Sequence, residues 1–237
     1  KVLGMLKGAS SQPPPEERVT KLKAPSPLEG AGMKLVLENI GRHFNREWIF
    51  KNINYSFETT QSYAILGANG SGKSTLLQLI AGSLSPSTGK INCYLNCEIV
   101  DNEDLFRHIS LAAPYLELIE EFTLEESIHF HFQFKNYLPH LDARAILELL
   151  DLKKYARKML KYFSSGMKQR VKLALAFCSD TPLLLLDEPT SNLDQQGVNW
   201  YLSLIEQFTN NRLTIIFSNQ EQEYQFCNHH ILLSDYK

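Results

Sequence analysis

Short apolar runs separated by polar loops recur along most of the chain. The most apolar of them is four consecutive leucines at 183–186. So short a run is typical of a strand buried on both faces of a parallel sheet. Runs of similar character occur at 63–66, 109–112 and 213–217. We expect these four segments to be strands of one mostly parallel sheet.

A second pattern, in which apolar and polar residues alternate, predicts antiparallel strands beside that sheet. The apolar positions before the run at 63–66 are Leu35, Leu37, Ile40, Ile53, Tyr55 and Phe57. Thr88-Gly89-Lys90 then leads into a predicted hairpin that ends near Val100.

Helical spacing of apolar residues dominates the middle of the chain. Leu124 to Lys135 has Thr123 as a helix cap and acids in its first turn, and Ala143 to Leu150 repeats the amphipathic spacing. We expect residues from about 113 to 163 to form a helical insert. The fold class is therefore α/β, with an antiparallel β subdomain and this insert.

The most specific motif follows the run at 63–66 and matches G-x-x-x-x-G-K-[ST], with one additional glycine. In such a loop, small residues let backbone N–H groups turn inward around a polyphosphate, and the next helix points its positive end at the same anion. We expect Lys73 to reach the outer phosphates and Ser74 to ligate Mg²⁺. The predicted loop consists of Gly67, Ala68, Asn69, Gly70, Ser71, Gly72, Lys73, Ser74 and Thr75.

Two acids, Asp187 and Glu188, follow the leucine run directly. Ligands of open α/β sheets bind at the carboxyl ends of the strands. We expect Asp187 to hold Mg²⁺ and Glu188 to orient or deprotonate the attacking water. The alternative is a surface turn that Pro189 closes.

Two further segments complete a family pattern: Phe163-Ser164-Ser165-Gly166-Met167-Lys168-Gln169-Arg170 and Ser191-Asn192-Leu193-Asp194. With them, residues 35–233 resemble the nucleotide-binding subunits of ABC (ATP-binding cassette) transporters, in the same motif order. The resemblance implies a P-loop NTPase core with an antiparallel β subdomain and a helical insert. It also implies ATP and Mg²⁺ as the bound groups.

The first of these segments departs from the family's usual Leu-Ser-Gly-Gly-Gln but keeps Ser164 and Gly166. The resemblance implies that these two residues bind the γ-phosphate of a nucleotide held by a second subunit, with Asp194 at the same interface. Two ATP molecules would then lie between two chains arranged head to tail. Without the family, the segment is a capped helix start with Ser164 or Ser165 as the cap.

Three further positions are assigned by their spacing from these motifs. Phe44 falls where the family has an aromatic ring that stacks on adenine, although it could equally be a core residue; Trp48 is a weaker candidate. Pro114 stands near the family's usual glutamine and lacks both a polar side chain and a backbone N–H. Gln220 aligns with the family's switch histidine and lacks its charge.

Losing one hydrogen bond to a charged group costs roughly 1.5–3 kcal/mol, so the changes at Pro114 and Gln220 predict slow rather than absent hydrolysis. We expect an ATPase subunit that drives a separate membrane permease, in a homodimer or heterodimer, with an exporter favoured. The alternative is a catalytically degenerate, nucleotide-gated module that pairs with another ATPase chain.

Composition adds few constraints. The 237 residues include 43% hydrophobic residues and carry a formal charge of −2, which suits one substantial core and gives no general attraction to nucleic acid. No apolar stretch approaches the length of a membrane span. We expect a cytoplasmic protein that reaches the inner face of the membrane through its permease.

Two remaining features lead to expectations about the chain's ends and its thiols. Residues 1–32 are rich in proline and charge, so we expect an irregular arm that was added for expression, with Met33 as the natural start. A natural extension is the alternative. Cys93 and Cys97 should share one face of the predicted hairpin, as ordinary cysteines rather than metal ligands.

Overall fold

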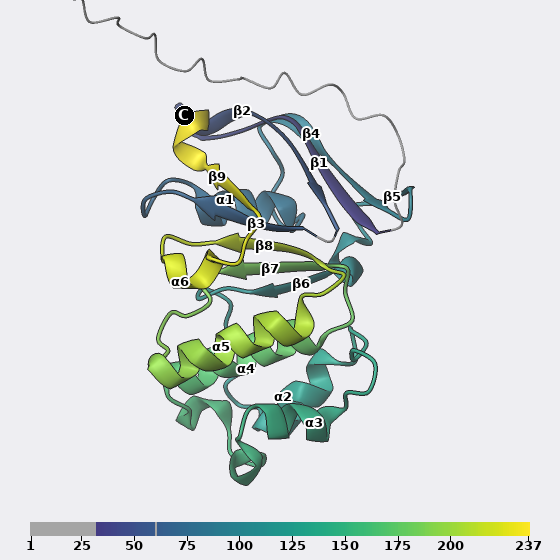
Figure 1. Ribbon diagram of the computed structural model, residues 1–237, viewed down its shortest axis with the longest axis vertical. Coiled ribbons are helices and arrows are strands. Elements are labelled where there is room, and N and C mark those ends of the chain that lie inside the picture. Colours follow the sequence, from purple (N-terminus) through teal and green to yellow (C-terminus); the bar gives the residue numbers. More distant parts are fainter. Residues whose placement is uncertain (1–31, 60) are drawn as a thin grey trace, which may run out of the picture.

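The protein is described by a computed structural model that covers residues 32–59 and 61–237. The arm expected at residues 1–32 therefore lies, except for Gly32, outside the described residues. Figure 1 shows layers that run from an antiparallel sheet, through a helix and a parallel sheet, to helices on the opposite side.

The antiparallel sheet has the strand order β2-β1-β4-β5. Its strands are β1 (Met33–Phe44), β2 (Glu47–Glu58), β4 (Thr88–Leu95) and β5 (Glu98–Val100). The predicted antiparallel strands and the predicted hairpin are thus confirmed.

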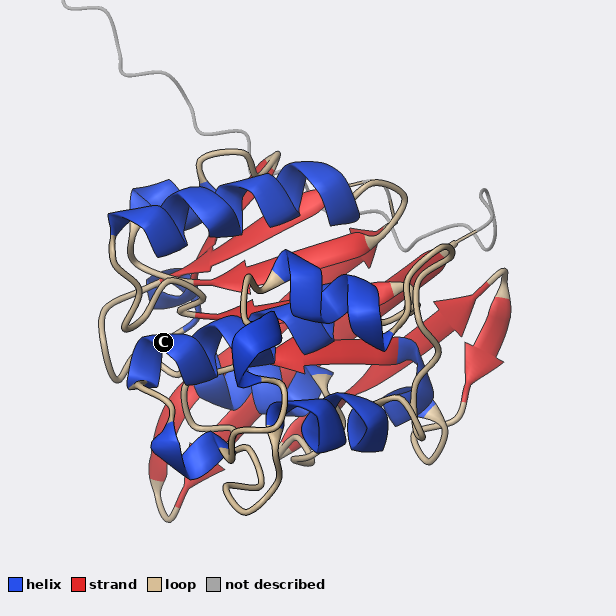
Figure 2. Cartoon of the chain, turned by 90° about the horizontal axis from the view of Figure 1, so that it is seen from below, coloured by secondary structure: helices blue, strands red, loops and turns tan. Residues whose placement is uncertain are grey.

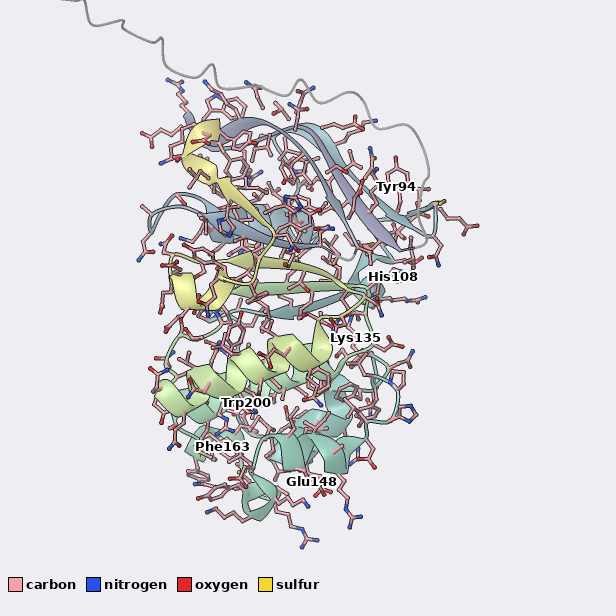
Figure 3. All side chains as sticks on the ribbon, viewed as in Figure 1. Tyr94, His108, Lys135, Glu148, Phe163 and Trp200 are labelled. Carbon is pink, nitrogen blue, oxygen red and sulfur yellow. The ribbon has the colours of Figure 1, made fainter. Side chains whose placement is uncertain are left out.

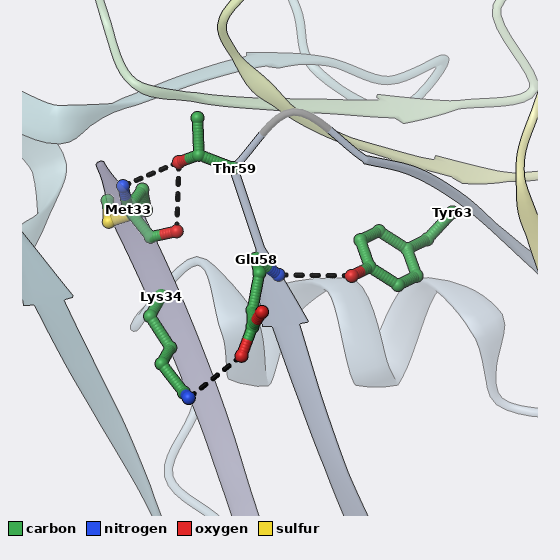
Figure 4. Close-up of polar contacts among 5 residues, drawn as sticks. All are labelled: Met33, Lys34, Glu58, Thr59 and Tyr63. Atoms are coloured by element: carbon green, nitrogen blue, oxygen red, sulfur yellow. Dashed lines mark hydrogen bonds and ion pairs between the residues drawn. The ribbon is translucent and has the colours of Figure 1, made fainter. Parts of the chain in front are cut away.

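Polar contacts join one end of this sheet to the parallel sheet (Figure 4). Met33 N donates to Thr59 Oγ1 at 2.5 Å, and the Lys34 ammonium lies 2.8 Å from the Glu58 carboxylate. Glu58 N donates to the hydroxyl of Tyr63 at 3.1 Å. Because Tyr63 belongs to the first strand of the parallel sheet, this bond links the two sheets.

The second sheet is parallel throughout and has the order β6-β7-β8-β3-β9. Its strands are β3 (Ser62–Leu66), β6 (Ile109–Ala112), β7 (Leu183–Asp187), β8 (Leu213–Phe217) and β9 (His229–Leu232). All four strands expected from the short apolar runs are present.

The leucine run in β7 is buried on both faces, as its composition predicts. Leu183 and Leu185 pack in the cluster that contains the antiparallel sheet and α1 (Lys73–Ile80). Leu184 and Leu186 point the other way, into a cluster with α4 (Ser165–Cys178) and α5 (Gln195–Phe208). Alternation along one strand therefore joins the two halves of the core.

The helical insert packs beneath α4 and α5 (Figures 1 and 2). Its helices are α2 (Leu124–His131), α3 (Ala143–Leu149), η2 (Lys153–Tyr155) and η3 (Leu160–Tyr162). The other helical elements are η1 (Leu105–His108), α6 (Glu221–Tyr224) and η4 (Leu233–Tyr236). Within the described ranges, every helix is too short or too polar to cross a lipid bilayer.

The first helix of the insert ends earlier than its sequence predicts. Thr123 caps it through a complete capping box with Glu126, but the helix stops at His131 rather than Lys135. Phe132 stacks on Tyr137 with ring centroids 3.7 Å apart. Lys135 donates instead to the carbonyl of Ile109, at 2.8 Å, at the start of β6 (Figure 3). These tertiary contacts outweigh the helical spacing.

The expectation that Cys93 and Cys97 share one face of the hairpin is wrong. Cys93 is buried in β4, whereas Cys97 is exposed in the turn between β4 and β5, with φ of 75°. The strand ends at Leu95, so the alternation that would place both thiols on one face stops before Cys97.

Trp200 connects α5 to the insert. Its indole N–H donates to the carbonyl of Leu149, at 3.1 Å, and its ring lies 4.7 Å from the guanidinium of Arg170 (Figure 3). The helical insert is therefore attached to the core by polar contacts as well as by apolar packing.

At Gly72, the residue before α1, the backbone packs closely against side chains of β2. It has φ of 105°, and an added Cβ would lie 2.4 Å from Cγ2 of Ile49. Gly70 also has positive φ, but among the described atoms none would come within 4 Å of its Cβ. Both changes to alanine strain the backbone, so each should lower the free energy of unfolding by about 1–3 kcal/mol. Gly72→Ala should cost about 1–3 kcal/mol more than Gly70→Ala because of the clash with Ile49.

Urea unfolding of the two variants measures this difference. Equal losses of stability would show that β2 does not fix the start of α1.

His131 should make stability depend on pH. Its Nε2 lies 2.9 Å from the Ser179 hydroxyl, and burial, with Lys135 adding to the effect, lowers the pKa of His131 to about 4. The pKa in the unfolded chain is about 6.5. As pH falls from about 6.5 to about 4, the unfolded chain gains a proton that the folded chain does not, so folding stability should decrease across that window.

His131→Phe should flatten this dependence, since phenylalanine does not titrate. His129→Phe, on an exposed position of the same helix, is the matched control and should keep the wild-type slope. Unfolding free energies at pH 7 and pH 5 test the expectation, and an unchanged slope in His131→Phe would contradict it.

Candidate functional site

A cavity of about 250 Å³ lies where the loop after β3 meets the start of α1. The loop leaves the carboxyl end of β3 and passes directly into the helix at Lys73. The helix begins where the phosphate loop predicts it. The cavity is lined by Ile49, Asn69, Gly70, Gly72, Lys73, Ser74, Thr75 and Glu188.

Lys73 is buried, and its ammonium is held inside the loop. Nζ donates to the carbonyl of Gly67 at 2.7 Å and lies 3.4 Å from that of Ala68. The hydroxyl of Ser71 is also buried, and among the described residues it has no hydrogen-bond partner. The loop thus concentrates donor groups, and those groups suit an anion.

Ser74 and Asp187 meet at the mouth of the same loop. The Ser74 hydroxyl donates to Oδ2 of Asp187 at 2.8 Å. Burial raises the pKa of Asp187 to about 6, the nearby Glu188 adds to the rise, and the bond from Ser74 opposes it. A buried carboxylate beside a hydroxyl is a pair of oxygen ligands suited to a small divalent cation such as Mg²⁺.

Glu188 has a strained backbone conformation at the edge of the cavity. Its φ is 41°, in the left-handed region that costs a non-glycine residue about 1–3 kcal/mol. Its N–H donates to the carbonyl of Phe217 at 2.9 Å, and its own carbonyl accepts from Ser191 N at 3.0 Å. These bonds hold Glu188 in the orientation that places it on the cavity wall.

The loop after β6 places Tyr115, rather than Pro114, near the acids. Lys172 donates to the carbonyl of Pro114 at 2.9 Å. Tyr115 is 43% exposed; its partial burial, followed by the charge of Asp187, raises the pKa of Tyr115 to about 12. The sequence prediction missed Tyr115, although a polar aromatic residue directly after Pro114 was the available indication.

In the loop after β8, the residue before the predicted Gln220 lies against the phosphate loop. Asn219, not Gln220, contacts the phosphate loop: its Oδ1 accepts from Gly67 N at 3.3 Å and its Nδ2 donates to Asn69 Oδ1 at 3.1 Å. Gln220 is the N-cap residue of α6, and its Oε1 accepts from the side chain of Gln222 at 3.1 Å. The reason is that the Ser218 hydroxyl accepts from Gln220 N at 2.9 Å, which turns the chain into α6 at this point.

The segment before α4 forms a capped helix start. Ser164 is the N-cap and accepts from Met167 N at 3.2 Å, which decides between the two serines considered as caps. A Cβ on Gly166 would lie 2.8 Å from the carbonyl oxygen of Asn192, so only glycine allows the two segments this approach. Asp194 caps α5 by accepting from Gly197 N at 2.8 Å.

The aromatic candidates lie at the end of β1 and the start of β2. Phe44 has 49% of its surface exposed, which excludes the alternative that it is a core residue. The guanidinium of Arg42 lies 4.6 Å from its ring centroid. Trp48 is 45% exposed and packs edge-on against His43. Neither ring lines the cavity, where Ile49 contributes the nearest apolar surface on this side.

Comparison with known proteins agrees with this geometry. The family model described as "ABC transporter" matches residues 50–191, more than half of the chain. The linearmycin resistance ATP-binding protein LnrL of Bacillus subtilis is 28% identical over 193 residues, 80% of this chain and 62% of that protein. The cytochrome c biogenesis ATP-binding export protein CcmA of Brucella abortus is 32% identical over 179 residues, 74% of this chain and 80% of that protein.

Solved structures share the fold. A putative ABC transporter ATP-binding protein from Pyrococcus furiosus superposes with a TM-score of 0.72 at 21% identity, covering 86% of this chain and 99% of that one. The dimeric ABC transporter cassette MJ0796 gives a TM-score of 0.71 at 22% identity, covering 84% of this chain and 94% of that one. The matches to LnrL and to the Bacillus subtilis protein YcbN span only 62% and 49% of those proteins. The chain belongs to the ABC transporter family and has the fold of its ATP-binding domain.

Proposed function

We propose that this chain binds ATP with Mg²⁺ in the cavity at the start of α1 and hydrolyses it. The observation that carries the proposal is the 2.8 Å bond between Ser74 and Asp187, because it brings the phosphate loop and the acidic strand end together. Glu188 lines the same cavity as Lys73 and Ser74, so the proposed groups for phosphate binding, metal binding and proton transfer lie around one cavity.

In this structure, the proposed phosphate ligand Lys73 bonds to other atoms of the loop. Lys73 exchanges its bonds to the Gly67 and Ala68 carbonyls for bonds to the outer phosphate oxygens. The unpartnered hydroxyl of Ser71 supplies a further donor beside the loop. Because α1 starts at Lys73, the positive end of its dipole also points at the bound anion.

Ser74 and Asp187 are the residues that hold Mg²⁺. The bound cation neutralises phosphate charge and stabilises the charge that develops during transfer. Asp187, whose pKa is raised by burial, would be deprotonated as a ligand of the cation.

Glu188 is the general base of the reaction. It accepts a proton from a water molecule whose oxygen bonds to the γ-phosphorus, while the bond from that phosphorus to the bridging oxygen breaks and ADP leaves. Because Asn219 contacts the phosphate loop, we assign to it, in place of Gln220, the contact to the γ-phosphate. Tyr115, which follows Pro114 and is near enough to Asp187 for that charge to raise its pKa, would supply the polar group that Pro114 lacks.

Two chains are proposed to close head to tail on two ATP molecules. Ser164 and Gly166 would present the start of α4 to the partner's nucleotide, with Asp194 beside them. The exposed ring of Phe44 would stack on adenine on the face that Arg42 leaves open. MJ0796 is described as a dimer in its own structure, which supports this arrangement.

The motion of closure is proposed to drive a separate membrane permease, with the chain on the cytoplasmic face. The name of CcmA describes an export protein and that of LnrL a resistance protein, and both favour export. We therefore propose an exporter subunit.

A second candidate is a catalytically degenerate module that binds ATP and pairs with an active ATPase chain. Pro114 favours it, because this residue offers no side-chain donor or acceptor and its carbonyl is already bonded to Lys172. The two candidates differ in whether this chain alone turns over ATP.

Glu188→Gln should reduce Mg²⁺-dependent ATP turnover by at least about 100-fold, because glutamine cannot accept the proton. ATP binding should persist, and light scattering should show a doubled mass when the variant is loaded with Mg·ATP. Wild-type turnover per chain should rise with protein concentration, since two chains form each site.

Glu206→Gln is the matched control, an exposed glutamate of α5 far along the helix from Asp194. It should turn over ATP at the wild-type rate. If the wild type binds ATP but shows only the rate of Glu188→Gln, the degenerate module is the correct function.

A further inference from the structure

A carboxyl group that the proposed reaction does not use is buried behind the site. Glu223 lies in α6 and has no exposed surface. Among the described residues, no ion pair includes Glu223. An unpaired buried carboxyl is costly unless hydrogen bonds satisfy it, so its contacts indicate why it is there.

Glu223 bonds to two loops that are distant in sequence. Oε1 accepts from Thr190 N at 2.7 Å and from the Thr190 hydroxyl, and Oε2 accepts from the hydroxyl of Ser218. Its position is fixed in turn by Tyr201, whose hydroxyl donates to the Glu223 carbonyl at 2.8 Å. The carboxylate therefore acts as a bridge between Thr190 and Ser218.

One of those loops carries the residue that contacts the phosphate loop. The Ser218 hydroxyl donates to Glu223 and accepts from Gln220 N at 2.9 Å, so it fixes the backbone on both sides of Asn219. The side chain of Asn219 then reaches Gly67 and Asn69.

The other loop carries the acids. Thr190 is two residues beyond Glu188, and Ser191 N donates to the carbonyl of Glu188 at 3.0 Å. Glu188 N in turn bonds to Phe217 O, next to Ser218. A continuous chain of contacts thus runs from the phosphate loop, through Asn219, Ser218 and Glu223, to the segment that holds Glu188.

We propose that Glu223 is a positioning residue that holds Asn219 against the phosphate loop and couples its loop to the segment that carries Glu188. The inference rests on the proposed ATPase function for its effect on turnover. The structural link between Glu223 and Gly67 does not depend on that function.

Glutamine at position 223 is the discriminating change because it keeps the shape of the side chain. Its carbonyl oxygen can still accept from Thr190 N, but its NH₂ group cannot accept from Ser218. The Ser218 hydroxyl then loses the acceptor of its proton. It can accept from the new amide as well as from Gln220 N, but the charge-assisted bond that fixed its orientation is gone. Asn219 should lose its fixed position although the fold is kept.

The first measurement is the backbone amide NMR spectrum of the full chain without nucleotide. Glu223→Gln should shift or broaden the amide signals of Gly67 and Asn69, and Asn219→Ala should affect the same signals. Glu221→Gln makes the same chemical change at an exposed position of α6 and should leave both signals in place. Ser218→Ala removes only the hydroxyl, should reproduce the effect of Glu223→Gln, and replaces that variant if it does not fold.

The second measurement separates kcat from KM. Glu223→Gln should lower kcat about tenfold and change KM for ATP by less than about twofold, as expected for a group whose effect appears in the transition state. Glu221→Gln should keep both constants.

The outcomes are distinct. Unchanged Gly67 and Asn69 signals in both Glu223→Gln and Ser218→Ala overturn the inference, whatever the activity. Shifted amide signals together with a wild-type kcat overturn the proposed effect of Glu223 on turnover. If the wild type itself has no turnover, the proposed function fails, and the NMR comparison still decides whether Glu223 positions Asn219.

Discussion

The structure depends on the double burial of β7. A strand of four leucines with packed residues on both faces has no surface on which to place a polar group until it ends. The first polar side chain, Asp187, therefore appears at the carboxyl end while it is still enclosed. Its charge has to be balanced locally, which the hydroxyl of Ser74 begins to do. The position of the acidic groups at the site is therefore set by the residue at which the buried strand ends.

The same constraint explains the positions of the surrounding loops. In a parallel sheet all strands end on the same edge, so the loops after β3, β6, β7 and β8 converge around Asp187. The phosphate loop, Tyr115, Glu188 and Asn219 come from these four connections. Each arrives from a different part of the sequence, and the strand order alone makes them neighbours.

Sequence reasoning predicted the parts of this arrangement that depend on repetitive patterns. The leucine run, the glycine-rich loop and the capped start at Thr123 each carry their own local cause, so their elements are found where expected. The contact between Asn219 and the phosphate loop was not predicted, because which of two neighbouring amides lies against that loop depends on the tertiary bond between Ser218 and Glu223. Cys97 was misjudged for a similar reason, since β4 ends at Leu95, before the alternation reaches it. Tyr115 was not considered, because its nearness to Asp187 depends on the path of the loop after β6.

The balance of charge at this edge finally shows why a divalent cation suits the site. Burial is the main cause that raises the pKa of Asp187; the charges of Glu188 and Glu223 add to the rise, and the bond from Ser74 and the charge of Lys73 oppose it. Three carboxyl groups thus stand close to one buried ammonium, and a nucleotide triphosphate would bring further negative charge into the same low-dielectric space. The dipole of α1 contributes only a fraction of a unit charge. The doubly charged cation that we propose for Ser74 and Asp187 would supply the missing compensation, whereas Glu223, held by three hydrogen bonds, needs no cation to remain buried.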